Sequence, residues 1–292
     1  MKGWLVALII VIVLAGAGFG AYSYITGSSE TVAYLNIESG NVELNRGAGW
    51  QAATDQMQLK QKDSVRTLQD GQASIVFYES DIMELEPNTE VSLTQLVANS
   101  VAVNQKSGET WNRVSKLTGT RQYTVETPNS VATVRGTGFG VNVSEEGDEI
   151  IVDEGTVECS LPDRRTPRQI MEYKSCMVKN GQISEGEITK EQLLLMKRKI
   201  QTGIFVLKKM QIRELQKKGF LINALKKRYN MTDAEFKQFI ERVDSGEVDL
   251  SRLKQGMPVR MKSLDKVVSI TQKIVELNKR LQKIDEKLAS ME

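Results

Sequence analysis

Cys159 and Cys176 are the two side chains whose type and spacing point most directly to a chemical reaction. The 16 residues between them are rich in Arg, Pro and Asp, and short segments typical of strands flank both cysteines. In an oxidising compartment two such thiols can form a disulfide between neighbouring strands, worth roughly 2–4 kcal/mol. The alternative is a pair of buried free thiols. We expect the disulfide if this part of the chain lies outside the cytoplasm.

The composition excludes most enzyme chemistry. The chain of 292 residues contains no histidine and only two cysteines. Without histidine there is no Ser-His or Cys-His nucleophile pair, and the usual general base near neutral pH is missing. A tetrahedral zinc site built from Cys and His would need three or four such ligands. We therefore expect a protein that is not an enzyme and that uses no metal or cofactor.

A glycine-rich run from Arg135 to Phe139 contains the best candidates for ligand binding. Gly136 and Gly138 permit a bulge or a sharp bend between two strands. Their spacing is not that of a nucleotide-binding loop, and a strand-like segment follows where a helix should begin. Arg135 could pair with a carboxylate of the sheet or face a ligand. We name Arg135 and Phe139 as candidate binding residues, with a purely structural role as the alternative.

The N-terminal segment is long and apolar enough to cross a membrane. No charged residue occurs between Gly3 and Ser29, and residues 4–25 would form a helix of about 33 Å, against a hydrocarbon layer of about 30 Å. A cleaved signal peptide is the alternative, because Ala15-Gly16-Ala17 resembles a cleavage site. We expect residues 1–27 to be a single-pass anchor in the cytoplasmic membrane. Lys2 places the N-terminus inside and the bulk of the chain outside the cytoplasm.

Residues 28–186 have the pattern of an all-β domain, a sandwich or a roll. Apolar residues alternate with polar ones in short runs such as 73–78, 81–85 and 149–152, and turn residues separate the runs. The breaks include Asp70-Gly71 and Pro87-Asn88. Many short strands at close spacing are typical of sandwiches and barrels.

Residues 187–292 change to the 3.6-residue period of an all-α module. We expect a long helix from Thr189 to about Tyr229 and a shorter one that Thr232 and Glu235 cap in a capping box. The last helix, after Pro258, has a coiled-coil pattern with apolar residues at alternating spacings of three and four. These are Val267, Ile270, Ile274, Leu277, Leu281, Ile284, Leu288 and Met291.

The partner of this coiled-coil seam, residues 267–291, is open on sequence grounds. The g positions Lys266, Lys273, Arg280 and Lys287 are all basic, so a parallel homodimer would gain few g-to-e ion pairs. Intramolecular packing against the helix that begins at Thr189 is an equal alternative. The seam therefore predicts either a homo-oligomer or a folded-back helix.

The charges divide between the two modules. Residues 28–186 hold 14 Lys and Arg against 23 Asp and Glu, and residues 187–292 hold 24 against 14. The basic module would suit nucleic acid only in the cytosol, and the predicted topology places it outside, so we exclude nucleic acid. The basic module could instead bind the acidic β domain, anionic lipid or an envelope polymer. The alternative is that its charges only solvate the exposed faces of the helices.

Several motifs of the β region together resemble the FecR family. The resemblance covers about 150 residues, and its most specific part has the pattern T-P-x-x-V-A-x-V-R-G-T-x-F. The motifs are Ser39-Gly40-Asn41-Val42-Glu43-Leu44, Pro87-Asn88-Thr89, Thr127 to Phe139 and Asp153-Glu154-Gly155-Thr156-Val157.

The resemblance implies transmembrane signalling, in which the state of an outer receptor is passed to a sigma factor through a cytoplasmic segment. Only residues 1–3 precede the predicted membrane helix here. We therefore expect an extracytoplasmic binding or scaffold module that engages a protein or an envelope polymer. The alternative is a FecR-type signalling regulator that acts through partner membrane proteins.

Overall fold

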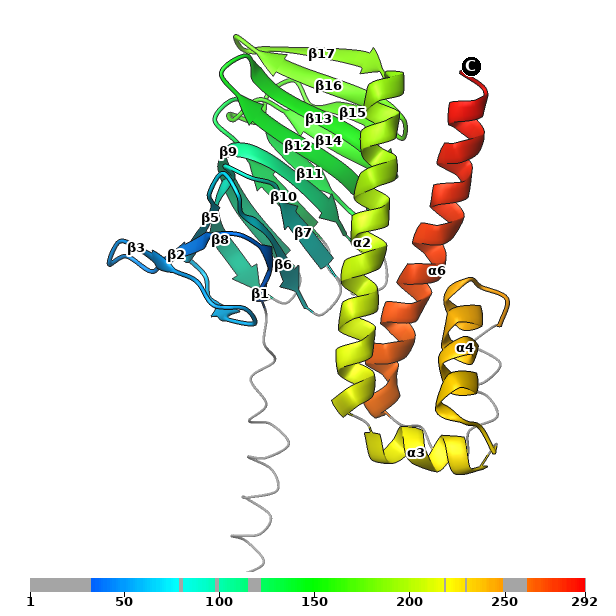
Figure 1. Cartoon of the computed structure of the whole chain (residues 1–292). Coiled ribbons are helices and arrows are strands. Elements are labelled where there is room, and N and C mark those ends of the chain that lie inside the picture. The colour runs from blue at the N-terminus through cyan, green and yellow to red at the C-terminus, as the bar shows by residue number, and fades with distance from the viewer. Residues whose placement is uncertain are drawn as a thin grey trace, which may run out of the picture.

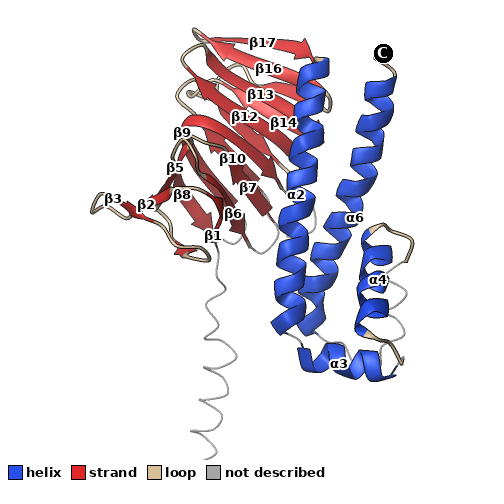
Figure 2. Cartoon of the chain, in the orientation of Figure 1, coloured by secondary structure: helices blue, strands red, loops and turns tan. Residues whose placement is uncertain are grey.

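The computed structural model describes residues 33–78, 81–97, 100–114, 122–217, 219–228, 230–248 and 262–291. The predicted membrane segment, residues 1–27, lies outside these residues. Among the described helices, none combines the length and the apolar character that crossing a bilayer requires. The described chain forms a β domain of two packed sheets and a set of C-terminal helices, two of which lie along one sheet (Figures 1 and 2).

The first sheet is antiparallel throughout and faces the helices. Its strands follow one another in space in an order that differs from their order in the sequence, and each is paired with the next. The spatial order is β4 (Gln58–Leu59), β1 (Ala33–Ser39), β6 (Gln72–Phe77), β7 (Asp81–Leu85), β9 (Ser100–Arg113), β12 (Gly138–Ser144), β13 (Gly147–Glu154), β16 (Lys174–Lys179) and β17 (Gln182–Glu187).

The second sheet lies behind the first and shares β9 with it. Its pairs are antiparallel except for β9 and β10, which run parallel. In spatial order it contains β3 (Trp50–Ala52), β2 (Val42–Asn45), β5 (Ser64–Thr67), β8 (Glu90–Val97), β9, β10 (Gln122–Glu126), β11 (Val131–Val134), β14 (Thr156–Ser160) and β15 (Arg168–Met171).

Strand β9 joins the two sheets because it bends at a glycine. Its first half pairs with β8 and β10 in the second sheet, and residues 108–113 pair with β12 in the first sheet. At the bend Gly108 has a φ of +83°, and a Cβ there would lie 2.4 Å from the Thr89 hydroxyl oxygen. Only glycine combines this backbone conformation with so close a neighbour.

The core between the sheets is apolar and includes three aromatic rings. Tyr123 stands between Phe77 and Phe139, with ring centroids 6.0 and 6.3 Å away in edge-to-face geometry. All three side chains are buried. The Tyr123 hydroxyl donates to the Asn112 side-chain oxygen at 2.8 Å, so the one polar group of the three rings is paired. The all-β prediction for this region is confirmed.

The helical part contains α2 (Lys190–Lys217), α3 (Gly219–Arg228), α4 (Asp233–Asp244) and α6 (Lys262–Ala289). Thr189 caps α2, because its hydroxyl accepts from Gln192 N at 3.2 Å and its own N–H donates to the Gln192 side chain. The predicted capping box of Thr232 and Glu235 is also present. The single long helix predicted from Thr189 to Tyr229 is wrong in one respect, since the structure assigns its last part to a separate helix, α3, which lies across the end of α2 (Figure 1).

Helices α2 and α6 pack side by side and together cover the outer face of the first sheet (Figure 2). The seam residues Ile270, Ile274, Leu277 and Ile284 share one buried cluster with the apolar residues of α2 and with Trp111 of the sheet. Of the two alternatives for the seam, the chain therefore adopts the intramolecular one. We call α2 and α6 the helix pair, and the sheet surface beneath it the covered face.

Candidate functional site

The covered face carries carboxylates among its apolar side chains. Side chains alternate along a strand, so in β7 Met83 and Leu85 enter the core between the sheets while Ile82 and Glu84 face the helix pair. The same alternation turns Glu109, Trp111 and Arg113 of β9 outward. This face is the candidate functional site, because it combines buried charges with a surface that two long helices occupy.

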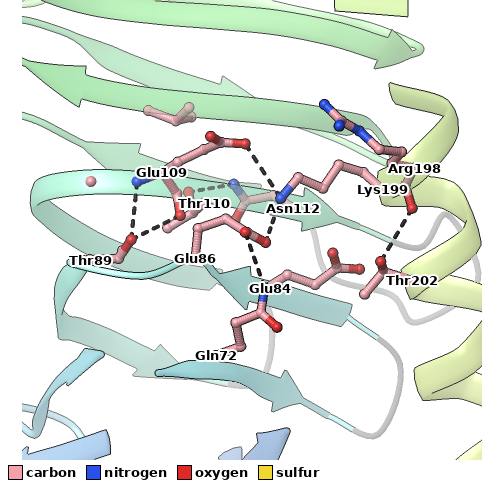
Figure 3. A network of polar contacts seen from close by, with 12 residues as sticks. Gln72, Glu84, Glu86, Thr89, Glu109, Thr110, Asn112, Arg198, Lys199 and Thr202 are labelled. Atoms are coloured by element: carbon pink, nitrogen blue, oxygen red, sulfur yellow. Dashed lines mark hydrogen bonds and ion pairs between the residues drawn. The ribbon is translucent and has the colours of Figure 1, made fainter. Parts of the chain in front are cut away.

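Lys199 of α2 enters this face between two glutamates (Figure 3). Its ammonium group makes an ion pair with Glu86, and Glu109 lies 3.4 Å away. The side chain of Lys199 is 8% exposed. Thr89 fixes the backbone of Glu109, since its hydroxyl donates to Glu109 O at 3.1 Å and accepts from Glu109 N at 3.0 Å. A buried lysine with two carboxylates is the pairing that a desolvated cation requires.

A second charged cluster lies beneath Gly203 of α2. Arg113 donates from Nη1 to Asp153 Oδ2 at 3.2 Å, and its Nε lies 3.9 Å from Glu84, too far for a hydrogen bond. Burial raises the pKa of Glu84 to about 8, although Arg113 opposes that shift. A Cβ at Gly203 would lie 2.6 Å from Arg113 Nε. The glycine therefore lets α2 approach the sheet above this cluster.

Arg280 of α6 makes the third charged contact. Its Nε donates to Asp153 Oδ1 at 3.1 Å and its Nη1 to Glu172 Oε1 at 3.3 Å. Its guanidinium also lies 5.7 Å from the Tyr173 ring centroid. Burial alone would lower the pKa of Arg280, but Asp153 and Glu172 outweigh it and the pKa is raised. Asp153, which is completely buried, is thus held between one guanidinium of the sheet and one of the helix pair.

Among the described residues, the ion pairs between the helix pair and the β domain place the positive charge on the helices and the negative charge on the β domain. The helices supply the cations Lys199, Arg213 and Arg280, and the β domain supplies carboxylates, including Asp55, which lies 3.2 Å from Arg213. Gln192 at the start of α2 donates to Glu149 at 2.7 Å. The opposite charges of the two parts of the sequence therefore meet in this interface.

The structure places the two sequence-predicted binding residues apart. Arg135 is exposed at the end of β11, while Phe139 is fully buried in the core between the sheets. Gly136, with a φ of +68°, forms the turn between their strands. Phe139 packs against Tyr123 and offers no surface to a ligand, so the two residues do not form a common site.

Cys159 of β14 and Cys176 of β16 are brought together as predicted, but not on neighbouring strands, because β14 belongs to the second sheet and β16 to the first. Both are buried, and their sulfur atoms are 2.8 Å apart. Both cysteines are free in this structure. The chain therefore shows the second of the two alternatives, a pair of buried free thiols, and the disulfide in an oxidising compartment stays a prediction.

The family motif Thr127-Pro128-Asn129-Ser130 is a turn held by a buried carboxylate. Asp148 accepts from Asn129 N at 3.1 Å, from Asn129 Nδ2 at 3.0 Å and from Ser130 Oγ at 3.2 Å. Thr127 also donates to the same carboxylate. These hydrogen bonds tie the turn after β10 to the start of β13, which explains why the motif contains short polar residues around its proline.

Comparison with known proteins finds a family match within the β domain. Residues 63–158 match the family described as FecR protein. These residues form a FecR domain. The resemblance seen in the sequence motifs is thereby confirmed for this part of the chain. No curated protein matches the sequence.

Two crystal structures of a candidate anti-sigma factor from Parabacteroides distasonis ATCC 8503 are similar to part of the chain. The structure at 1.65 Å resolution aligns with a TM-score of 0.40 and 19% identity, over 45% of this chain and 64% of that one. The structure at 2.50 Å gives a TM-score of 0.39 at 19% identity, over 45% and 63%. Each alignment spans less than two thirds of the neighbour's length.

The charged residues of the covered face were missed by sequence reasoning, although two of them leave a signal. Lys199 interrupts the apolar stripe of α2 between Met196 and Ile200, and Glu84 interrupts the buried run of β7. A charge on an apolar stripe is almost never fully buried without a partner. The identity of the partner, however, depends on how the helix pair is placed on the sheet.

Proposed function

We propose that this chain is a non-enzymatic signalling regulator of the FecR type that acts through partner membrane proteins. The observation that carries the proposal is the FecR domain at residues 63–158. Of the two functions that the sequence leaves open, this domain favours the regulator over a passive scaffold. In the proposal residues 1–27 anchor the chain in the cytoplasmic membrane, and the FecR domain and the helix pair lie outside the cytoplasm.

The covered face supplies a physical basis for regulation. Buried ion pairs contribute little net stability, because desolvation of both charges offsets their attraction. The ion pairs of Lys199 and Arg280 therefore fix where the helix pair lies on the sheet, but they add little to the free energy of docking. A partner protein that binds the helix pair or the covered face more tightly would shift the chain to an undocked arrangement. This supports a role in which docking of the helices reports the state of a partner.

The test compares transcripts in cells with and without the chain under envelope stress. We expect deletion to change a limited set of transcripts and the wild-type chain to restore it. Lys199→Glu places a third negative charge beside Glu86 and Glu109. We expect cells with this variant to differ from wild-type cells in the levels of these transcripts. Lys279→Glu, at an exposed position of α6, is the matched control and should behave like the wild type.

The scaffold hypothesis makes a different forecast for the same strains. Transcripts that do not respond to deletion would contradict the regulator. Crosslinking in intact cells followed by mass spectrometry then separates the two, because a regulator captures a specific membrane protein. Capture of only envelope polymer or of the chain itself would favour the scaffold.

A further inference from the structure

Basic side chains surround the place where β1 begins. Ala33, the first residue of β1, pairs with the end of β4. Lys60 and Lys62 follow directly after β4, both are exposed, and neither has an ion pair among the described residues. Arg46 is 46% exposed and donates to Gln58 O of β4 at 2.7 Å, so it reaches the same point. The β domain is acidic as a whole, yet three cations meet here.

The carboxylates that contact this cluster are engaged within the protein. Asp63, which is 5% exposed, accepts from Lys60 N at 2.9 Å and lies 3.3 Å from Arg46 Nε. Asp55, in the loop before β4, pairs with Arg213 of α2 at 3.2 Å. The side-chain charges of the two exposed lysines are therefore not neutralised by these carboxylates, and they face solvent.

The helices continue the basic surface beyond the edge of the β domain. Arg213 donates to Asn36 of β1 at 3.1 Å, and Lys217, one turn further along α2, is 66% exposed although it pairs with Glu214. Lys227 of α3 is also exposed. Figure 1 shows β1 and α3 toward the same end of the molecule, with β16 and β17 at the other end. Cations of both modules are therefore gathered at one end.

The proposed membrane anchor ends a short distance along the chain from this cluster. Only residues 28–32 separate the predicted anchor, residues 1–27, from Ala33, and Glu30 is the one charged residue among them. An extended chain covers at most about 3.5 Å per residue, so Ala33 lies within about 20 Å of the membrane. The bilayer surface is therefore held within reach of the basic end.

We propose that this basic end, made of Arg46, Lys60, Lys62, Lys217 and Lys227, binds the phosphate groups of anionic phospholipids. The proposal rests on the anchor of the proposed function and adds the surface that lies on the bilayer. Anionic lipid attracts basic residues within about one Debye length, about 8–10 Å near physiological salt. An acidic protein would be attracted in the same way, but the short linker favours the membrane because it keeps the two surfaces together.

Lipid contact at this end also bears on the docking of the helices. The basic end contains residues of the β domain and residues of α2 and α3, so a flat bilayer contacts both modules only while they keep their relative position. Binding to the docked arrangement more tightly than to an undocked one would favour docking. A membrane rich in anionic lipid would then oppose a partner protein that releases the helix pair.

Lysine acetylation of the full-length chain in nanodiscs, read out by mass spectrometry, tests the proposal. Discs of phosphatidylcholine alone are compared with discs of phosphatidylcholine and phosphatidylglycerol. At low salt we expect Lys60 and Lys62 to react at least roughly threefold more slowly in the anionic discs, and this difference should vanish in 1 M salt, where the Debye length is about 3 Å. Lys179 of β16, exposed at the opposite edge of the first sheet, should react equally in both discs.

A charge reversal tests whether the cations act as one surface. In the double variant Lys60→Glu and Lys62→Glu, the protection of Lys217 and Lys227 by anionic lipid should fall at least roughly twofold, because the β domain no longer holds this end on the bilayer. Lys179→Glu is the matched control and should keep the wild-type protection. Circular dichroism checks that each variant is folded, as expected for substitutions at exposed positions.

Equal acetylation of Lys60 and Lys62 in the two kinds of disc would overturn the proposal. Slower acetylation that extends equally to Lys179, or full protection in the double variant, would also contradict it. These results would leave the anchor and the regulator function intact. A chain that does not enter nanodiscs at all would instead refute the anchor, and this proposal would fall with it.

Discussion

The two faces of the first sheet bury side chains of different kinds. The inner face contributes Phe77, Phe139 and aliphatic residues to a core in which the aromatic rings meet edge to face. The covered face mixes Val76, Ile82 and Trp111 with Glu84, Arg113 and Asp153. Both faces exclude water, but the ion pairs to the helices lie on the covered face.

This difference separates what holds the β domain together from what positions the helix pair. Apolar burial is non-directional and stabilises in proportion to area. Buried ion pairs add little net free energy yet penalise every arrangement in which one partner is left alone. We infer that the inner face provides stability and that the covered face provides one defined position for α2 and α6, which a competing partner can change.

The largest effect is expected from a substitution on the inner face. Phe139→Ala removes a fully buried ring next to Tyr123 and should lower the free energy of unfolding by about 3–5 kcal/mol. Urea unfolding followed by circular dichroism measures it. Phe205→Ala, at a position of α2 that is 65% exposed, should change stability by less than about 0.5 kcal/mol. Equal effects at the two positions would contradict the assignment of the core.

A smaller and more local effect is expected on the covered face. Arg280→Met leaves Asp153 with Arg113 alone, so we expect a loss of about 2–3 kcal/mol, below the full cost of an orphaned buried charge. Hydrogen exchange should become faster in α6 while β12 and β13 stay protected. Uniformly faster exchange in strands and helices would show that the two faces are not energetically separate. Adding Asp153→Asn completes a double-mutant cycle for the pair.

Much of the fold follows from local patterns in the sequence. The run Asp81–Leu85 is a strand with the predicted bounds, and the capping residues Thr189 and Thr232 mark where α2 and α4 begin, because these signals act between neighbouring residues. Strand β9 was not predicted, since it alternates weakly and changes sheets at Gly108. The break between α2 and α3 was also missed, because the apolar pattern continues through it.

The candidate site was harder to predict because it depends on contacts between distant segments. Lys199 and Glu86 are 113 positions apart and Arg280 and Asp153 are 127 apart. The charge imbalance between the two parts indicates that they attract each other, but it does not say which residues pair. By contrast, Cys159 and Cys176 are only 17 positions apart in the sequence, and their proximity could be anticipated.

The close approach of α2 to the sheet is tested at Gly203. Gly203→Ala would place a methyl group 2.6 Å from Arg113 Nε, and Arg113 cannot easily move because Asp153 holds it. Overpacking costs about 1–3 kcal/mol, and alanine returns up to about 1 kcal/mol of helix propensity, so we expect a net loss of about 1 kcal/mol. Gly219→Ala in α3, where a Cβ would contact nothing within 4 Å, should be neutral or stabilising. A stabilised Gly203→Ala protein would show that α2 is not tightly docked there.

The smallest effect concerns pH and the protonation of the covered face. Burial raises the pKa of Glu84 from 4.5 to about 8, opposed by Arg113 and reinforced by Glu38 and Glu86. Between these two values the folded chain binds more protons than the unfolded chain. This residue's contribution is therefore full below about pH 4.5 and is lost as the pH rises through 8, with a slope of at most about 1.4 kcal/mol per pH unit.

Glu84→Gln should remove this slope without changing the inner core, which urea midpoints across about pH 5 to 8 would reveal. Glu146→Gln, at an exposed hairpin position, should keep the wild-type slope. A variant at Glu84 that still loses stability as steeply as the wild type would mean that this carboxyl is ionised while buried. Arg113 would then hold Glu84 as a charged partner, as it holds Asp153.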